Sequence, residues 1–583
     1  MPQKNRGNDS DKIAEQAEEI YFRLVGSMRG RYPIDTINLF IIFACYIMYK
    51  YKKSDYKGLL LYDLIFTTDL GIDPSVLMAI YNSYNKDVFE QSMMPLTTCD
   101  DDRIFVEIIE KYAIKGYGQV NRSTGDHSTP ESVILLAERL LQIQKEENVA
   151  DVCSGNGDFL CHALRKHPFA HYSGYEINML SVAISKIRAD INGHQLRIEP
   201  GDALLNLEQT STQYDKIFCN YPFSMRTFGD MQIGNKYNHL AKNNRCDWLF
   251  NTLVCEHLAE NGKAVTVSTI GSLWNMLDRE ARKYFIDNGL IESIIFLPAG
   301  VYRPYTEIET AIIVFSKNNS SVHFVNASNY RGLMNEHEEN DEHHRLMNYE
   351  IDKIIALLHE DVDGISFSVD NDTIKDANYD LSIKSYYSDL PKYENGVKIS
   401  EVAEILRGVV INSKMISEES GGDCVVRLSD IQGAIVPEKL SFAKDGVIEK
   451  SIALEDGDII ISRTLNPMKV AIFTGNKNKV YPCGNLFVVR LRDTDTLDPY
   501  YLLSFLLSEE GQKALEFAAT GTSLKVIGAN SLGNTIFPMV GMKRQKEISE
   551  RIKAALMEVN TYEYKLMKAK DKIRGAFYEG GER

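Results

Sequence analysis

The stretch NVADVCSGNGDF, residues 148 to 159, places a short apolar strand directly before two closely spaced glycines. Its spacing is D-x-x-x-G-x-G-x-F, formed by Asp151, Gly155, Gly157 and Phe159. Glycines at a strand-to-helix turn let the backbone approach a ligand closely, at the carboxyl end of the strand. The stretch therefore predicts a site for a nucleotide-like cofactor, although a tight turn without a ligand explains the glycines equally well when they are taken alone.

The surrounding sequence, from about residue 118 to about residue 317, alternates between strand-like and helix-like runs. Examples are HYSGYEI, MLSVAISKIRADING and YDKIFCN. Alternation of this kind predicts a parallel sheet with helices on both faces.

Two acidic residues follow the next two predicted strands. Glu176 lies about 20 residues past the glycines, where an acid can accept hydrogen bonds from both ribose hydroxyls. Asp202, in EPGDAL, lies where an adenine amino group is expected. A dinucleotide site requires a third glycine to approach the pyrophosphate, but position 160 is Leu160. The pattern therefore favours S-adenosylmethionine, with Phe159 at the wall of its site.

The fourth predicted strand ends in NYPF, which is Asn220, Tyr221, Pro222 and Phe223. By itself this is an ordinary N-x-P turn. It resembles the (D/N/S)-P-P-(Y/F/W) motif of the amino-methyltransferases of DNA. The resemblance implies that the Asn220 side chain and the Tyr221 carbonyl accept hydrogen bonds from a target amine. It also implies that Phe223 stacks on a flipped-out base and that Pro222 stiffens the turn.

Tyr221 departs from this family motif, which normally has proline there. A main-chain carbonyl is available from either residue, but the fixed φ of proline is lost, so the resemblance implies a less preorganised loop.

Two further segments resemble the methylation subunits of type I restriction-modification systems. In GDHSTPESVILLAERLL, the resemblance places Thr129 and Pro130 beside the amino-acid end of the cofactor; alone, the segment indicates only a helix N-terminus. SIIFLPAGVYRPYTEIETAIIVFSK is similar to that family's LP-x-G-(V/I)-F strand pair. The order of the cofactor loop, the catalytic loop and the specificity region is that of gamma-class N6-adenine enzymes.

The C-terminal third resembles half of a type I specificity subunit, with a single target recognition domain and a long helix. SLKVIGANSLGNTIFP, followed by Gln545, carries most of this resemblance. An arginine can read guanine edges and lysines can bind phosphate. The candidate DNA-binding residues are Arg463, Lys469, Lys477, Lys479 and Lys525, although a solvated face explains each of them singly.

An apolar stripe on the last predicted helix has two interpretations. Its members recur at three- and four-residue steps: Ile548, Ile552, Ala555, Leu556, Val559 and Tyr562. The stripe can pack on its own domain or pair with a second copy of the chain, which would supply the second recognition domain of a whole specificity subunit.

Composition sets the remaining expectations. The net charge of −16 argues against a general polyanion binder, but it does not exclude a basic cleft. The nine cysteines have no C-x-x-C or other metal-ligand spacing, so neither disulfides nor a metal site are expected. The N-terminus lacks the apolar segment of a signal peptide, and the apolar run from Ile37 to Tyr49 is shorter than a membrane span. These features predict a cytoplasmic chain with no membrane association.

The prediction is an α/β protein of three domains. Residues 1–115 form a helical N-terminal domain, and residues 116–390 a Rossmann-like S-adenosylmethionine-dependent methyltransferase domain with a mixed, mainly parallel sheet. Residues 391–583 form an α+β target recognition domain with a long C-terminal helix.

The predicted function is sequence-specific methylation of adenine N6 in double-stranded DNA, with any restriction subunit a separate protein. Two enzymatic alternatives are a methyltransferase for RNA or for a protein amide, and a fused nuclease for which no acidic motif is evident. A third alternative is a DNA-binding module whose methyltransferase fold has lost turnover through Tyr221.

Overall fold

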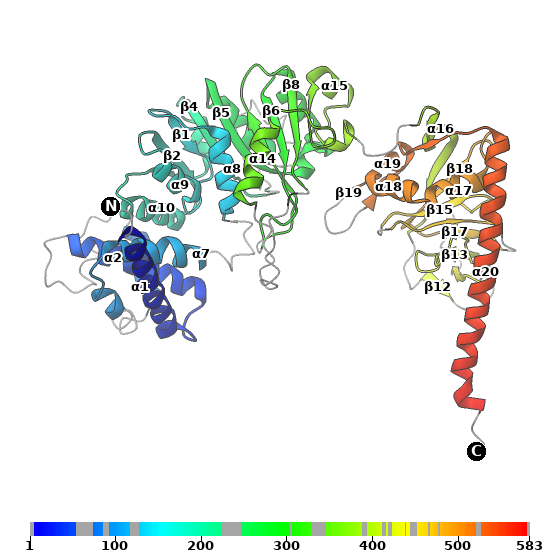
Figure 1. Ribbon diagram of the computed structural model, residues 1–583, viewed down its shortest axis with the longest axis horizontal. Helices are drawn as coiled ribbons and strands as arrows, with labels where there is room; N and C mark the ends of the chain where they lie inside the picture. The colour runs from blue at the N-terminus through cyan, green and yellow to red at the C-terminus, as the bar shows by residue number, and fades with distance from the viewer. Residues whose placement is uncertain are drawn as a thin grey trace. The chain divides into compact units, whose positions relative to one another are not determined.

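The computed structural model describes residues 5–53, 74–84, 93–116, 128–223, 225, 246–303, 306–328, 330, 346–387, 393–410, 415–417, 423–437, 439–443, 452–464, 467–475, 478–520 and 526–579. The chain folds as two compact units, Met1–Tyr387 and Ser388–Arg583 (Figure 1). The sequence predicts a boundary near residue 390, close to this division. The predicted helical N-terminal region belongs to the first unit, so the division into three domains stays a prediction.

A nine-stranded sheet forms the centre of the first unit, with the strand order β3-β2-β1-β4-β5-β7-β6-β8-β9. The strands are β1 (Asn148–Asp151), β2 (His171–Glu176), β3 (Arg197–Pro200), β4 (Tyr214–Cys219), β5 (Leu258–Thr269), β6 (Ile291–Phe296), β7 (Thr310–Phe315), β8 (Ser321–Asn326) and β9 (Ser366–Asp370). Strands β1 to β5 pair in parallel, while β7 runs antiparallel to both β5 and β6, and β9 antiparallel to β8. The predicted mixed, mainly parallel sheet is confirmed.

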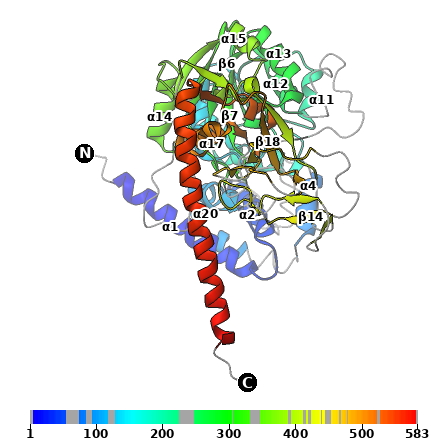
Figure 2. The same ribbon diagram turned by 90° about the vertical axis from the view of Figure 1, so that its right-hand side faces the viewer.

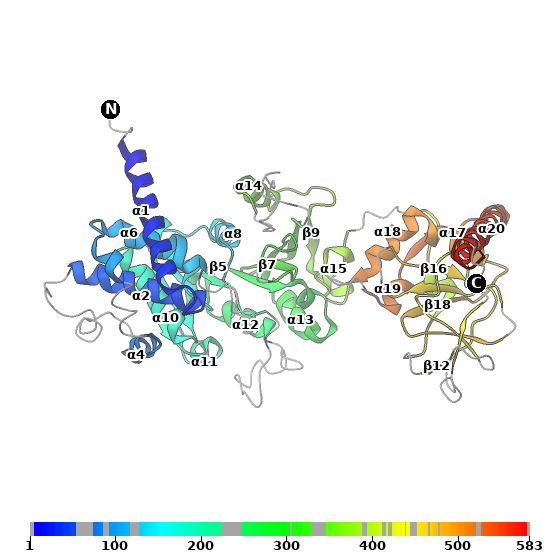
Figure 3. The ribbon, with the colours of Figure 1, turned by 90° about the horizontal axis from the view of Figure 1, so that it is seen from below.

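The sheet is buried because helices cover both of its faces. All six residues of β7 are buried, and its sequence, TAIIVF, is apolar at every position after Thr310, as expected for a strand covered on both faces. Helices α8 and α14 lie on one face, and α11, α12 and α13 lie on the other (Figure 3). The helices of this region are α8 (Glu131–Leu141), α9 (Asp158–Lys166), α10 (Met179–Ile191), α11 (Ala203–Glu208), α12 (Asp247–Glu256), α13 (Arg279–Asp287), α14 (Asn348–Leu357) and α15 (Asn371–Asp376). Short 3-10 turns are η3 (Ile270–Leu273), η4 (Met276–Asp278) and η5 (Ile383–Ser385).

The N-terminal region is helical, as predicted, and packs against α10 of the sheet region. Its elements are α1 (Asn5–Met28), α2 (Ile34–Lys53), α4 (Pro74–Asn82), α6 (Asp102–Glu107), the π-helical turn η1 (Ile108–Ala113) and α7 (Ile114–Gly116). Ala183, Ile184 and Ile187 of α10 belong to the same apolar core as α1 and α2. Tyr46 of α2 donates a hydrogen bond to Asp190 of α10 at 2.7 Å. The helices and the sheet therefore fold as one unit.

Helix α2 is the predicted apolar helix. By length and composition it could cross a membrane, but 67% of its apolar window is buried inside the protein. Residues 40 to 49 are all buried against neighbouring helices. A core helix of a soluble protein has these properties.

The second unit contains two four-stranded sheets, with the orders β11-β18-β15-β16 and β12-β14-β13-β17. Its strands are β10 (Gly396–Lys398), β11 (Ala403–Arg407), β12 (Ile416–Ser417), β13 (Cys424–Val426), β14 (Ser441–Ala443), β15 (Ile459–Ser462), β16 (Val470–Ile472), β17 (Val480–Pro482), β18 (Leu486–Leu491), β19 (Ala519–Thr520), β20 (Val526–Ile527) and β21 (Ile536–Pro538). Its helices are α16 (Ile399–Val402), α17 (Pro499–Leu507), α18 (Glu509–Ala518), α19 (Ala529–Gly533) and α20 (Met542–Glu579).

Strand β15 shows why this unit has two cores. Ile459 and Ile461 point toward the helices, whereas Ile460 points toward the second sheet, because successive side chains of a strand alternate between faces. The predicted α+β arrangement with a long C-terminal helix is confirmed. Helix α20 continues beyond the strands of its own unit (Figure 1, Figure 2).

The apolar stripe of α20 is divided in two. Ile548, Ile552 and Leu556 pack against the core of the second unit. Val559 and Tyr562 are 47% and 60% exposed. The first half of the stripe therefore packs on its own domain, and the second half does not.

Gln545 attaches α20 to the start of α17. Its side chain is buried, and Oε1 accepts a hydrogen bond from the Asp498 N–H at 2.9 Å. Nε2 donates to the carbonyls of Thr496 at 3.1 Å and Val540 at 2.7 Å. Asp498 is the N-cap of α17, so one amide of α20 connects the segment that precedes α17 to the segment that precedes α20.

We expect Gln545→Leu to destabilise the second unit by about 2 to 3 kcal/mol, because it leaves buried backbone groups without a partner. Calorimetry of the full chain would show the transition of this unit at a lower temperature. Gln432→Leu is the matched control, since Gln432 is exposed and makes one hydrogen bond, to Ser429. An unchanged transition in the Gln545 variant would exclude this role.

Candidate active site

The predicted site residues of the first unit lie at one edge of the sheet. Strands β1, β2, β3 and β4 are parallel neighbours, so their carboxyl ends meet at the same edge. Asp151 and Glu176 end β1 and β2, while Asp202 and Asn220 follow β3 and β4. The strand register places Asp151 of β1 opposite Gly174 of β2 and opposite Phe218 of β4.

Both glycines of the loop adopt left-handed backbone conformations. Their φ angles are +51° at Gly155 and +76° at Gly157. A Cβ atom at Gly157 would lie 2.9 Å from Ser185 Oγ, so both the conformation and the space require glycine. The backbone of this loop consequently lies close against α10.

Glu176 holds the loop from the neighbouring strand. Its Oε2 accepts a hydrogen bond from the Gly155 N–H at 2.8 Å, and its Oε1 accepts one from the Asn178 N–H at 2.7 Å. Burial raises the pKa of Asp151 well above its ordinary value, and the nearby negative charges of Glu176 and Asp158 act in the same direction. The loop is therefore surrounded by carboxyl groups.

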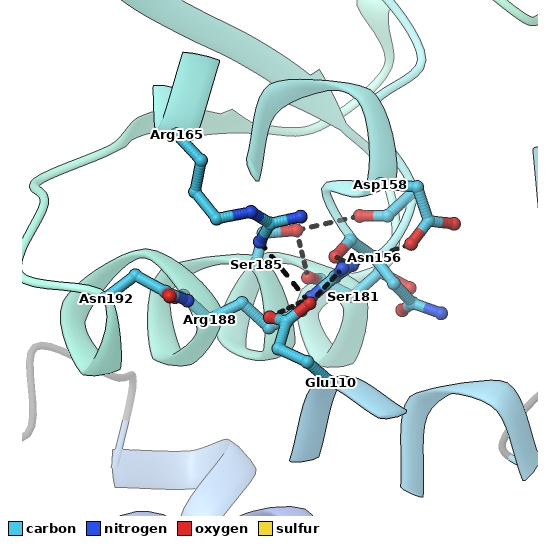
Figure 4. Close-up of polar contacts among 9 residues, drawn as sticks. Glu110, Asn156, Asp158, Arg165, Ser181, Ser185, Arg188 and Asn192 are labelled. Atoms are coloured by element: carbon cyan, nitrogen blue, oxygen red, sulfur yellow. Dashed lines mark hydrogen bonds and ion pairs between the residues drawn. The ribbon is translucent and has the colours of Figure 1, made fainter. Parts of the chain in front are cut away.

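A buried arginine, Arg188 of α10, joins the loop to the helical N-terminal region (Figure 4). Its Nε and Nη2 donate to the two carboxylate oxygens of Glu110, each at 2.9 Å. Its Nη1 donates to the carbonyl of Asn156 and to Asp158 Oδ1, each at 2.7 Å. Although burial raises the pKa of Glu110, its ion pairs with Arg188 and Arg165 hold that pKa below its ordinary value.

The same helix supports the loop at a second point. Ser185 Oγ donates to the Gly155 carbonyl at 3.0 Å, and it also approaches the Ser181 carbonyl at 2.9 Å (Figure 4). The sequence analysis did not identify Ser185 or Arg188. Their signal was a row of polar residues, Ser181, Ser185 and Arg188, at helical spacing.

The other predicted cofactor residues have different surroundings. Phe159 is buried in the core and stacks on Phe218 with 4.5 Å between ring centroids, so it supports the loop from beneath. Asp202 is partly exposed, and its Oδ1 caps α11 by accepting from the Leu204 N–H at 2.9 Å. Pro130 is the N-cap of α8.

Of the residues predicted to bind the cofactor, Thr129 contacts the NYPF loop, residues 220–223. Its Oγ1 accepts a hydrogen bond from Asn220 Nδ2 at 2.8 Å, although 91 residues separate the two. The structure therefore brings two predicted site segments together.

Within NYPF, the four side chains divide between the site and the core. Asn220, Pro222 and Phe223 are partly exposed, whereas Tyr221 is buried. The Tyr221 ring lies parallel to that of Phe250, with centroids 5.2 Å apart. Tyr221 therefore fixes the loop onto α12.

Tyr302 is a site residue that the sequence analysis missed, although its segment was quoted for the family resemblance. It is fully buried, and its hydroxyl donates to Asn220 Oδ1 at 3.2 Å. Its ring meets the Phe223 ring at 78°, with 5.0 Å between centroids. The spacing of residues along the sequence gives no signal for the contact between Tyr302 and Asn220, because the two residues follow different strands, β6 and β4.

In the second unit, the described DNA-binding candidates differ in exposure. Lys479 is exposed. Lys469 Nζ donates to the carbonyls of Leu428 and Ile431, and Arg463 Nη1 donates to that of Gly484. These two residues therefore also have structural contacts. Lys477 and Lys525 lie outside the described residues.

The strand order and the helices on both faces of the sheet define a Rossmann-like fold of the methyltransferase type. Residues 101–395 match the N-6 DNA Methylase family, and the chain belongs to that family. The sequence-based prediction of the family is confirmed.

One relative and two solved structures are similar to this chain. The type I restriction enzyme MpnII methylase subunit of Mycoplasma pneumoniae is 24% identical over 322 residues, which cover 50% of this chain and 58% of that relative. The methyltransferase subunit of a type I restriction-modification system from Streptococcus thermophilus has a TM-score of 0.50 at 16% identity, over 65% of this chain and 100% of that one. The type IIL restriction-modification enzyme MmeI, solved in complex with DNA, has a TM-score of 0.53 at 13% identity, over 94% of this chain and 91% of that one. These two structural likenesses concern the fold.

We expect Arg188→Met to destabilise the first unit by about 3 to 5 kcal/mol, because it removes the buried arginine partner of Asp158 and one of the two arginine partners of Glu110. Calorimetric unfolding would measure the loss. Arg197→Met is the control, since Arg197 pairs with Glu199 while 76% of its side chain is exposed. Equal stability of the two variants would contradict a structural role for the buried ion pairs.

Proposed function

We propose that this chain is a sequence-specific DNA methyltransferase that transfers a methyl group from S-adenosylmethionine to adenine N6. The observation that carries the proposal is the position of Asn220. Its amide is held between Thr129 and Tyr302 at the sheet edge where the glycine loop and Glu176 also lie. The membership of the family supports the reaction class.

The residues of the loop suit a nucleoside cofactor. A carboxylate accepts up to about four hydrogen bonds, so Glu176 can hold the loop and also accept ribose hydroxyls. At Gly155 a Cβ atom would meet nothing within 4 Å, so the absence of a side chain there leaves open space beside the loop. The bound cofactor supplies an electrophilic methyl group on a sulfonium.

The catalytic loop acts on the target amine by hydrogen bonding. Asn220 Oδ1 and the Tyr221 carbonyl accept from the two amine hydrogens and so orient the nitrogen lone pair toward the methyl group. An adenine amine is a weak nucleophile because its lone pair is delocalised into the ring, and these acceptors favour a more pyramidal nitrogen. Positioning and electrostatics are sufficient here, so no titrating base is needed. Phe223 supports the base by stacking.

The second unit reads the DNA sequence in this proposal. Its described candidates for base and phosphate contacts are Arg463, Lys469 and Lys479. The exposed end of α20 is the proposed dimer contact, and a separate restriction subunit is a further proposed partner. Such a chain works in the cytoplasm, where its DNA lies.

Asn220→Ala tests the reaction. We expect kcat to fall by at least about 100-fold, while cofactor affinity changes by less than about twofold, because the side chain acts mainly on the transition state. Single-molecule sequencing of treated DNA would report both the methylated base and its sequence context, and calorimetry would report cofactor binding.

Asn288→Ala is the matched control, because Asn288 is exposed at the end of α13 and bonds only locally, to the Tyr284 carbonyl. Methylation of RNA or protein in place of DNA would exclude the proposed substrate. Cofactor binding by the wild-type chain without any methyl transfer would identify a binding module.

The exposed end of α20 provides the test of the dimer. Val559, Tyr562 and Leu566 continue the face that carries Ile552 and Leu556, because residues three, four and seven apart share a helix face. They are 47%, 60% and 54% exposed. A second copy would cover this stripe by isologous pairing.

We expect Tyr562→Glu combined with Leu566→Glu to convert a dimer into a monomer in sedimentation. Met557→Glu is the control, since Met557 is 70% exposed on the opposite face of the helix. A wild-type monomer at micromolar concentration that still methylates a site would end the dimer proposal.

A further inference from the structure

Two tyrosines stand where the family motifs have other residues. Tyr221 replaces the first proline of the catalytic motif, and Tyr302 replaces the phenylalanine of LP-x-G-(V/I)-F. Both are buried. Tyr221 directly follows Asn220 in the chain, and Tyr302 contacts the Asn220 side chain. The two replacements therefore affect the same loop.

The loss of proline removes a covalent constraint. A proline ring fixes φ near −65°, whereas a tyrosine leaves φ free to vary. The side chain of Tyr221 is held by two contacts. Its ring stacks on Phe250, and its hydroxyl accepts a 3.5 Å contact from Asn251 Nδ2. These contacts fix the ring of Tyr221, but they do not reach the amide of Asn220.

Two hydroxyl groups hold the Asn220 amide, one at its nitrogen and one at its oxygen. Thr129, before α8, accepts from Nδ2 at 2.8 Å, and Tyr302, after β6, donates to Oδ1 at 3.2 Å. A phenylalanine at position 302 would fill the same space but could not hold the amide oxygen. A buried phenol hydroxyl also requires a partner, which makes this contact costly to break.

We propose that the Tyr302 hydroxyl is a positioning group for Asn220 and replaces the loop rigidity that proline supplies in the family motif. Tyr302 touches neither substrate nor cofactor in this role. It restricts the amide so that Oδ1 presents its remaining lone pair to the target amine. The inference rests on the proposed methyl transfer at Asn220.

Tyr302→Phe removes only the hydroxyl. We expect kcat to fall by about three- to tenfold, with the KM values for DNA and cofactor changed by less than about twofold. Tyr172→Phe is the matched control, because Tyr172 is also buried and its hydroxyl bonds two backbone carbonyls, those of Ala163 and His167. It lies at the start of β2, on the opposite edge from the site.

A second test asks whether the Tyr302 hydroxyl replaces the rigidity of the missing proline. In this test Tyr302→Phe is introduced into a Tyr221→Pro variant. There the loop is constrained covalently, so Tyr302→Phe should lower kcat by less than about twofold. An equal loss in both backgrounds would overturn the proposal, as would an unchanged kcat in the single variant or a loss confined to KM.

Hydrogen exchange provides a measurement that needs neither turnover nor the proline variant. In Tyr302→Phe, the backbone amides of residues 220, 221 and 223 should exchange at least about fivefold faster than in Tyr172→Phe. Equal exchange in the two variants would overturn the proposal even if Tyr221→Pro fails to fold. A wild-type chain without methyl transfer, but with this difference in exchange, would instead reject only the proposed function.

Discussion

The buried guanidinium of Arg188 is the contact on which the geometry of the first unit depends. It satisfies a carboxylate of the N-terminal helices, a carbonyl of the glycine loop and the first acid of α9 at once. A charge removed from water is stable only with such complete pairing, so none of these three elements can move without disrupting the others. The helical region is therefore structurally joined to the glycine loop.

Local sequence patterns predicted most of the fold and part of the site. The strand before the glycines, the acid that ends β2 and the NYPF turn were predicted because ligand sites in parallel sheets collect at strand ends. The insertion of β7 between β5 and β6 was not predicted, since periodicity reports burial but not pairing. Tyr302 was missed for the same reason: its contact with Asn220 spans 82 residues. The assigned roles of the individual site residues stay predictions.

Helix α20 shows a second limit of sequence patterns. An amphipathic stripe indicates that something covers it, but the pattern does not identify the partner. The structure covers the stripe up to Leu556 with the domain of the same chain. Gln545, which family resemblance singled out, lies at the start of this contact and holds the helix in place. Resemblance identified the residue, and the hydrogen bonds supply the physical reason.

In the proposed function, the acids that end β1 and β2, Asp151 and Glu176, give the site a preference based on ligand charge. Burial is the main cause of the raised pKa of Asp151, and repulsion by the negative charge of Glu176 raises it further. A cationic ligand relieves this repulsion, whereas a neutral ligand of the same shape does not. In the proposed reaction the sulfur of the cofactor is positively charged before transfer and neutral afterwards. In this proposal, electrostatics therefore favours the positively charged reactant over the neutral product at this edge of the sheet.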